Sequence, residues 1–483
     1  MKIALVDMPN FSYFENKSKF PSLSLGYLSG ILCKEGHEVL IFDNPKWLQS
    51  FEETYKGLLA FKPQLIGFTS FTENRFTSIS MIKSIKRDSG AIIIVGGSHF
   101  SFIADDALSN IPEIDIVVRR EGELTILDII DYVNEKKELS DIDGITYRSK
   151  NNEIISNKDR DFISDLDSIP MPKWELFSLD LYQARLIGTK NKTIGIISGR
   201  GCPHKCSFCS NAAFGRSTLR LRNYKSVVDE IVYLKSRFGY SAFKFSDDTI
   251  TINKTHIINL CEEILRRNLN INWSARVRID TIDEERITLM KKAGCVSLLF
   301  GAESGSTRIL KKINKRQTPD EIRAAIKLTA DIGFPLISVG FMVSLPYETV
   351  DDLKDTFSLM KEIKSFSRNI EVTYGFTQIF PGTELESIAL KEDLLPKKFS
   401  WNTYMEFPKY LVTNTHPTIP YFENKYLPLE KIKSLIIKNN IFSYSFKDLI
   451  RFLKRFKNLT QFKVLLRFLS QLFKNNEYCK NKF

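Results

Sequence analysis

The stretch TIGIISGRGCPHKCSFCSN, residues 193–211, joins an apolar run to a loop that carries three cysteines. The run TIGIIS is predicted to be a strand, because it is apolar and rich in β-branched residues and is followed by Gly and Pro. Cys202, Cys206 and Cys209 follow within eight residues. Structural zinc takes four ligands and disulfides need pairs, so the cluster raises the question of what fills a fourth position.

The alternation of strand and helix that begins at this stretch continues to about residue 390. Five further strands are predicted, at 242–247, 271–276, 296–304, 335–344 and 371–379. Helical spacing fills the gaps, and the helical runs 226–239 and 320–333 each close on a glycine. Six strand–helix units predict a partial, TIM-like (β/α)6 barrel. Chemistry in such folds gathers at the carboxyl ends of the strands, where the cysteine loop falls.

The N-terminal part of the chain shows a second alternating pattern. Apolar runs at 2–7, 38–42, 63–70, 91–97 and from 114 are separated by helical segments. They predict an α/β fold with a doubly wound, flavodoxin- or Rossmann-like parallel sheet. Such sheets bind ligands beyond the carboxyl ends of their strands. Those ends carry DMPN, TSFTEN, GGSHFS and REGE, all small or polar loop residues.

Four regions follow from these patterns. The sheet domain is expected over 1–140 and the barrel over 191–395. An extended linker is expected over 141–190, because DLDSIPMPKWELF (165–177) holds two prolines and has no helical period. A mostly helical, basic C-terminal segment is expected over 396–483. There, residues 446–473 place Phe, Leu and Ile at helical spacing with Lys and Arg between them.

Charge and cysteine usage limit the classes of protein. The net charge of the 483 residues is +12, and residues 401–483 hold 15 Lys and Arg against 5 Asp and Glu. The basic segment either covers the barrel with solvated helices or forms a peripheral surface for anionic lipid or a charged substrate carrier. It has no stacking motif, so nucleic acid binding is not expected. The sequence has no signal peptide, no long apolar run and only scattered further cysteines, so we expect a cytoplasmic protein, with peripheral contact to the inner membrane face as the finer alternative.

The cysteine cluster has three interpretations. A zinc site would need His204 as the fourth ligand, in a loop too short to wrap one tetrahedral ion without strain. Inert buried thiols fit poorly with so polar a loop; Cys33, Cys261 and Cys295, in helix or core contexts, are better explained by packing. An iron–sulfur cluster held by three thiolates would leave one iron open to a small molecule.

The segment CPHKCSFC (202–209) resembles the Cys-x3-Cys-x-aromatic-Cys signature of the radical S-adenosylmethionine (SAM) superfamily, with Phe208 at the aromatic position. The resemblance implies a 4Fe-4S cluster on Cys202, Cys206 and Cys209, with SAM on the fourth iron. Electron transfer would then cleave SAM to a 5′-deoxyadenosyl radical.

Further segments resemble those that surround SAM in this superfamily. FSDD (245–248) resembles the segment that holds the SAM amino group, although an Asp there also suits a helix N-cap. WSARVRID (273–280) offers two arginines, of which one would pair the SAM carboxylate or ribose region. FGAESGS (300–306) resembles the ribose-binding strand end, and GFMVSLPYET (340–349) a segment near the adenine. The implied SAM contacts are Phe208, Asp247, Asp248, Arg276, Arg278, Glu303 and Ser304.

The N-terminal domain resembles the cobalamin-binding module that precedes the barrel in one radical SAM class. The loop at 7–11 lacks the His that ligates cobalt in many cobalamin proteins. The loop histidine at 99 also suits a hydrogen bond to the backbone, and an empty domain is the alternative to a loaded one. The implied cobalamin contacts are Thr69, Ser70, Gly96, Gly97, Ser98 and His99.

The pairing of a radical generator with a corrin implies methylation of an unactivated carbon, with one SAM giving the methyl group and a second giving the radical. A rearrangement, cyclisation or oxidation without methyl transfer is the main alternative, and a cobalamin or redox sensor is a non-enzymatic one. A tRNA methylthiotransferase would carry three more cluster cysteines in its first domain, where this chain has only Cys33. The implied partners are a small-molecule or lipid-like substrate and an external electron donor such as flavodoxin or ferredoxin.

Overall fold

The structure is a computed structural model, and it describes residues 1–8, 20–43, 51–186, 189–215, 217–396, 399–402 and 419–439. The chain divides into two compact units, Met1–Leu429 and Glu430–Phe483. Of the second unit, the helix α16 (Leu429–Lys438) is described. The amphipathic helix predicted over 446–473 lies outside the described residues. Among the described helices, none is both long and apolar enough to cross a bilayer.

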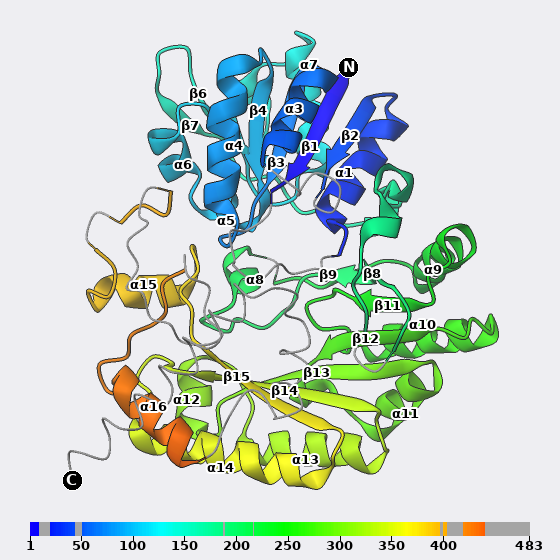
Figure 1. The fold of residues 1–483 in the computed structure, drawn as a ribbon, viewed down its shortest axis with the longest axis vertical. Helices are drawn as coiled ribbons and strands as arrows, with labels where there is room; N and C mark the ends of the chain where they lie inside the picture. Colours follow the sequence, from blue (N-terminus) through cyan, green and yellow to red (C-terminus); the bar gives the residue numbers. More distant parts are fainter. Residues whose placement is uncertain are drawn as a thin grey trace, which may run out of the picture. The chain divides into compact units, whose positions relative to one another are not determined.

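The first sheet has seven strands in the order β2-β1-β3-β4-β5-β6-β7 (Figure 1). All five predicted strands are present and pair in parallel. Their side chains are almost wholly buried, which explains why each reads as a continuous apolar run. Their bounds are β1 Lys2–Asp7, β2 Glu38–Phe42, β3 Leu65–Thr69, β4 Ile92–Gly96 and β5 Ile116–Val118.

The region predicted as an extended linker, 141–190, begins differently. β6 (Ile145–Arg148) and β7 (Ile154–Ser156) form an antiparallel hairpin that extends the first sheet beyond β5. The hairpin turns at Asn152, whose φ of 66° lies in the left-handed region. Only the rest of the region is extended, interrupted by short 3-10 helices at Leu166–Ser168, Trp174–Leu176 and Leu179–Leu181.

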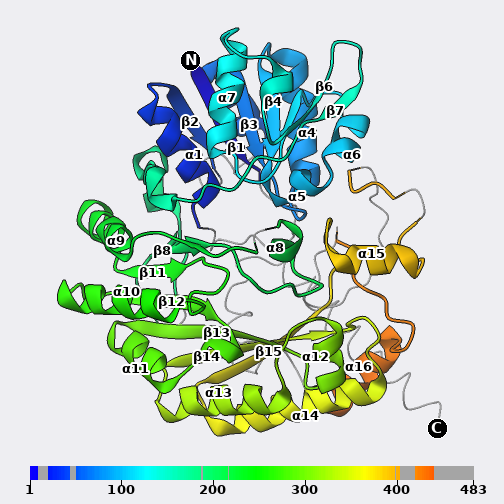
Figure 2. The same cartoon turned by 180° about the vertical axis from the view of Figure 1, so that it is seen from behind.

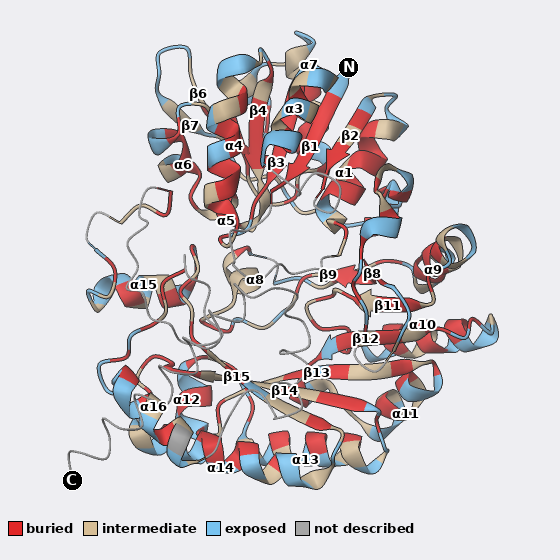
Figure 3. Cartoon of the chain, in the orientation of Figure 1, coloured by how far each residue is buried: buried red, intermediate tan, exposed pale blue. Residues whose placement is uncertain are grey.

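Helices cover both faces of the first sheet, with their exposed residues turned outward (Figure 3). α5 begins directly after β4, so the strand ends at Gly96 and the helix starts at Gly97. The helices are α1 Leu23–Lys34, α3 Phe51–Phe61, α4 Arg75–Asp88, α5 Gly97–Phe102, α6 Ala104–Asn110 and α7 Glu123–Val133.

The second sheet contains all six predicted strands in sequential order, β8-β11-β12-β13-β14-β15, and every pair is parallel. This is the predicted partial barrel, with helices along its outer face (Figure 2). Its strands are β8 Thr193–Ile196, β11 Ala242–Phe245, β12 Asn272–Val277, β13 Cys295–Glu303, β14 Leu336–Val343 and β15 Ile370–Phe376. Its helices are α9 Tyr224–Phe238, α10 Lys254–Arg266, α11 Glu284–Lys292, α12 Thr307–Lys312, α13 Pro319–Asp331, α14 Val350–Phe366 and α15 Glu384–Lys391.

The segment between β8 and α9 contains a short antiparallel strand pair and a short helix. β9 (Gly199–Arg200) pairs with β10 (Arg220–Leu221), and the short helix α8 (Ser210–Ala213) lies between them in the chain. In Figure 1, α8 lies between the first sheet and the barrel. The cysteine loop therefore sits where the two sheets face each other.

Candidate functional site

The three cysteines lie on the loop from β9 to α8, at the carboxyl end of the first barrel strand. All three are free thiols; Cys206 is buried, and Cys202 and Cys209 are half-buried. Backbone hydrogen bonds fix the loop from two sides, because Ser207 N donates to Ile313 O at 3.1 Å and Leu385 N donates to Ser207 O at 3.0 Å. The barrel thus holds this loop in place.

The surroundings of the loop suit anionic thiolates. Burial raises the pKa of the Cys202 and Cys209 thiols, so forming thiolates here requires positive charge nearby. Arg278 supplies it, since its Nη1 lies 3.9 Å from Cys206 Sγ. Within the described residues, no three His, Cys, Asp or Glu side chains converge on a point that could hold one metal ion. Thiolates bound to three different irons of a cluster need no such convergence.

The two arginines of WSARVRID have different positions. Arg278 is buried, pairs with Asp280 at 2.9 Å and donates to Lys315 O at 2.9 Å. Arg276 lies two residues earlier, on β12, and lines a cavity instead. Arg278 is therefore the arginine beside the thiols.

The two aspartates of FSDD also differ. Asp247 is buried and accepts hydrogen bonds from Ser198 N at 3.0 Å and Ser198 Oγ at 2.7 Å. Burial raises its pKa to about 6. Asp248 accepts a hydrogen bond from Asn211 and lines the cavity. Asp248 can reach a ligand, whereas Asp247 supports the strand that precedes the cysteine loop.

Glu303 ends β13 with a φ of 64° and pairs with Lys315 at 2.8 Å. Lys315 Nζ also lies 5.9 Å from the centroid of the Phe208 ring. Lys315 therefore links Glu303 to the aromatic residue of the cysteine loop. Ser304 is wholly buried and shares a hydrogen bond with Thr356. Glu303 is thus placed beside the cysteine loop, while Ser304 serves the local turn.

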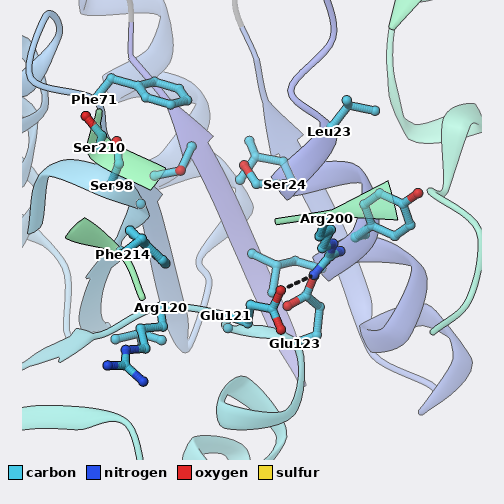
Figure 4. A pocket seen from close by; sticks show the side chains of 18 of the residues that line it. Leu23, Ser24, Phe71, Ser98, Arg120, Glu121, Glu123, Arg200, Ser210 and Phe214 are labelled. Atoms are coloured by element: carbon cyan, nitrogen blue, oxygen red, sulfur yellow. Dashed lines mark hydrogen bonds and ion pairs between the residues drawn. The ribbon is translucent and has the colours of Figure 1, made fainter. Parts of the chain in front are cut away.

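A cavity of about 570 Å³ opens between the loops of the first sheet and those of the barrel. From the first sheet it is lined by four of the predicted cobalamin contacts, Thr69, Gly96, Gly97 and Ser98. From the barrel it is lined by Ser210, Asn211, Ser246, Asp248 and Arg276. Figure 4 shows Ser98, Phe71, Ser210 and Phe214 on its wall. The lining therefore includes Ser210, the residue directly after Cys209.

Two predicted cobalamin contacts do not line this cavity. Ser70 is wholly buried and donates to Asn74 Oδ1 at 2.9 Å. His99 is also buried, with Nδ1 3.2 Å from Thr72 Oγ1 and its ring edge-on to Trp401. Burial lowers the pKa of His99 well below its usual value. The structure thus places His99 in the packing behind the loop and not at the cavity wall.

Comparisons with known proteins agree with this geometry. Residues 196–360 match the Radical SAM superfamily and residues 15–130 match the B12 binding domain. An uncharacterized methyltransferase of Pyrococcus horikoshii is 30% identical over 451 residues, which cover 92% of each chain. The chain belongs to the cobalamin-dependent radical SAM methyltransferase family.

Other similar proteins are more distant. The anaerobic magnesium-protoporphyrin IX monomethyl ester cyclase of Rubrivivax gelatinosus is 29% identical over 72% of this chain and 63% of its own. The fold matches TsrM of Kitasatospora setae, solved with cobalamin and a 4Fe-4S cluster, at a TM-score of 0.71, 17% identity and coverage of 92% and 89%. It also matches OxsB, solved with aqua-cobalamin and SAM, at a TM-score of 0.72, 18% identity and coverage of 97% and 70%.

Membership in the cobalamin-dependent radical SAM family assigns three cofactors, a 4Fe-4S cluster, SAM and cobalamin. The residues present fit all three. Free thiols on one loop suit the cluster, and Arg278 beside them offsets negative charge. Gly96 and Gly97 line the cavity, so a large ligand there would meet backbone without side chains at the end of β4.

An ion network that no local sequence pattern indicates joins the two domains of this radical SAM enzyme. Glu121 accepts from Arg200 at 3.1 Å and from two Arg220 nitrogens at 2.8 Å each. Glu123 accepts from Arg200 at 2.7 Å, as Figure 4 shows. The four side chains are all at most 11% exposed. The REGE loop at the end of β5 supplies both carboxylates, but the arginines that pair with them lie about 80 and 100 residues away in the sequence.

The charge state of Glu121 predicts a pH dependence of stability. Burial alone raises its pKa, but the hydrogen bond from Arg220 and the charge of Arg200 bring it to about 2. Because this lies below the unfolded value of about 4.3, the stabilisation is complete above about pH 5 and is lost as the pH falls toward 2. We expect the difference in unfolding free energy between the wild type and Glu121→Gln, measured by urea unfolding, to shrink over that window. A difference that stays constant from neutral pH down to about pH 3 would contradict this assignment.

Substitution of Gly97 is expected to weaken cobalamin binding without affecting the iron content. Its φ is +88°, and an added Cβ would lie 2.6 Å from Ser70 O and 2.8 Å from Ser70 N. Gly97→Ala would therefore displace the loop that lines the cavity, and we expect cobalamin affinity to fall about tenfold from strain of about 1–3 kcal/mol. Iron per chain should not change. The control is Gly90→Ala, where an added Cβ meets nothing within 4 Å. Equal cobalt content in both variants would show that this loop does not hold the corrin.

Proposed function

We propose that this enzyme transfers a methyl group from SAM to an unactivated carbon of a small-molecule substrate. One observation carries the proposal. The loops of the cobalamin domain and the residues just after the cluster cysteines line the same cavity of about 570 Å³. Methyl carrier and radical source would then act on a single bound substrate.

The residues have separate tasks in this proposal. Cys202, Cys206 and Cys209 hold the cluster, and Arg278 offsets the negative charge of the thiolates. Asp248 and Glu303 would bind the polar groups of SAM. Thr69, Gly96, Gly97 and Ser98 would hold cobalamin. When bound, the cluster supplies the electron that cleaves SAM, and cobalamin carries the methyl group.

The stoichiometry follows from the balance of atoms and electrons. One SAM gives up its methyl group and leaves as S-adenosylhomocysteine. A second SAM would take up one electron and be cleaved to methionine and a 5′-deoxyadenosyl radical, which becomes 5′-deoxyadenosine by taking a hydrogen atom from the substrate carbon. Each turnover consumes two electrons, so we propose a one-electron donor such as flavodoxin or ferredoxin as partner.

The test does not require the natural substrate. Anaerobic holoenzyme, loaded with cobalamin, is incubated with SAM and a chemical reductant. Because the methyl group cannot be passed on, we expect about one equivalent of S-adenosylhomocysteine per bound cobalamin, formed in a burst. Formation of 5′-deoxyadenosine should accompany it. Cleavage of SAM to 5′-deoxyadenosine with no S-adenosylhomocysteine would contradict methyl transfer.

The alternative, cyclisation or another reaction without methyl transfer, is favoured by the cyclase relative. That outcome would leave SAM cleavage intact and remove only the S-adenosylhomocysteine burst, so the same assay separates the two reactions. Contact between the basic C-terminal segment and anionic lipid stays a prediction, since residues 440–483 lie outside the described part of the chain. A cytoplasmic location and a lipid-like substrate also stay predictions.

A further inference from the structure

Two basic side chains share the inner face of the barrel. Lys244 lies on β11 and Arg276 on β12, and these strands pair in parallel with Lys244 opposite Ser274. Side chains alternate between the two faces of a strand. Phe243 and Phe245, on either side of Lys244, are buried in the outer layer, whereas Lys244 is half-buried and Arg276 is exposed. Both cations therefore project into the barrel interior.

Neither cation has an acidic partner in the part of the chain that the structure describes. Among the described residues, Lys244 and Arg276 make no side-chain hydrogen bond or ion pair. Lys244 Nζ lies 5.0 Å from the centroid of the Phe20 ring. Burial and the charge of Arg276 lower the pKa of Lys244. By contrast, the nearby Arg278 is fully paired with Asp280.

The neighbouring acids are already engaged. Asp248 lines the same cavity as Arg276, but it accepts a hydrogen bond from Asn211. Glu303 on β13 is paired with Lys315. The positive charge of the two interior cations is therefore left for a ligand to neutralise.

The inner face of the next strands carries small or uncovered residues, starting with Leu299, which is in register with Arg276. Gly340 on β14 and Gly375 on β15 occupy inward positions, and an added Cβ would meet only Phe300 O at 3.7 Å or nothing within 4 Å, respectively. Leu299 on β13 is 40% exposed although it lies in the middle of a barrel strand. Small and uncovered residues in this position indicate room for a ligand.

We propose that the barrel interior binds an oxyanion of the substrate, a phosphate or a carboxylate, between Lys244 and Arg276. This inference deepens the proposed function, and it rests on that function in taking the bound anion to be part of the substrate. Arg276 lines the cavity that the cobalamin domain shares, so an anion held here would direct the rest of the molecule toward that cavity. Arg276 then serves the substrate, and Arg278 remains with the cluster and SAM.

The test measures anion binding directly. Anaerobic holoenzyme is titrated calorimetrically with inorganic phosphate and, separately, with acetate, both with and without excess SAM and at matched chloride. We expect saturable binding that persists with SAM and weakens about tenfold or more in Lys244→Met and in Arg276→Met, because each removes a charge-assisted contact. Tighter binding of phosphate indicates a phosphorylated substrate, and tighter binding of acetate a carboxylate.

The control variant is Lys327→Met, on the exposed face of α13, where the lysine pairs with Asp331 at 3.1 Å. It should bind as the wild type does. The iron and cobalt content per chain shows whether each variant binds its cluster and cobalamin, and the circular dichroism spectrum shows whether it is folded. No saturable binding by the wild type, equal binding in all variants, or displacement of phosphate by SAM would each overturn the proposal. SAM cleavage, measured on the same preparations, reports separately on the proposed function.

Discussion

Cys206→Ala is expected to reduce bound iron and the formation of 5′-deoxyadenosine to background. Cys206 is the buried member of the three thiols, and its sulfur lies 3.9 Å from Arg278 Nη1. Its loss leaves two half-buried thiols, too few for a cluster that is held by three and keeps its fourth iron for SAM. Iron per chain and 5′-deoxyadenosine, measured after anaerobic reconstitution with SAM and reductant, are the readouts.

The matched control is Cys33→Ala, since Cys33 is a free, half-buried thiol near the end of α1. This variant should keep its iron and its SAM cleavage. Cobalamin binding should survive in both variants, which shows that the first domain remains folded. Full iron content in Cys206→Ala would place the cluster elsewhere.

Glu121→Gln is expected to lower the free energy of unfolding by about 3–5 kcal/mol, because it leaves Arg200 and Arg220 buried without their shared carboxylate. Arg220 retains only its bond to Ile163 O, at 2.6 Å, and Arg200 retains Glu123. Urea unfolding of the apoprotein near pH 7, followed by circular dichroism, measures the loss.

Glu52→Gln provides the comparison. Glu52 pairs with Lys56 at 3.3 Å on the exposed surface of α3. Exposed pairs of this kind contribute about 0–1 kcal/mol. Similar small losses in both variants would mean that the buried network adds no more stability than a surface pair.

The fold could be predicted from the sequence because buried parallel strands form continuous apolar runs. All eleven predicted strands occur, from β1 to β5 and in β8 and β11 to β15. The hairpin of β6 and β7 was not predicted, because its strands are only four and three residues long and pair locally, without a helix between them. Short strands carry too few residues to show a period.

Positions at the cavity could be predicted from the sequence only for residues at or near the end of a strand. Thr69, Gly96 and Ser98 lie at strand ends, and strand ends of one sheet share an edge. The difference between Asp247 and Asp248 depends on Ser198, which lies 49 residues away from Asp247. No local pattern reports such a contact, nor the burial that draws His99 away from the cavity.

The ion network also bears on how the two domains could be exchanged. Arg200 lies two residues before Cys202, so the carboxylates of the cobalamin domain hold the base of the cluster loop. A chimera could join this barrel to a corrin-binding domain that lacks acids at these two positions. The guanidinium groups of Arg200 and Arg220 would then be buried at the domain interface without carboxylate partners. The cluster loop would lose its anchor even with every cysteine intact. The domains form a matched pair, and a functional graft must carry Glu121 and Glu123 along with the barrel.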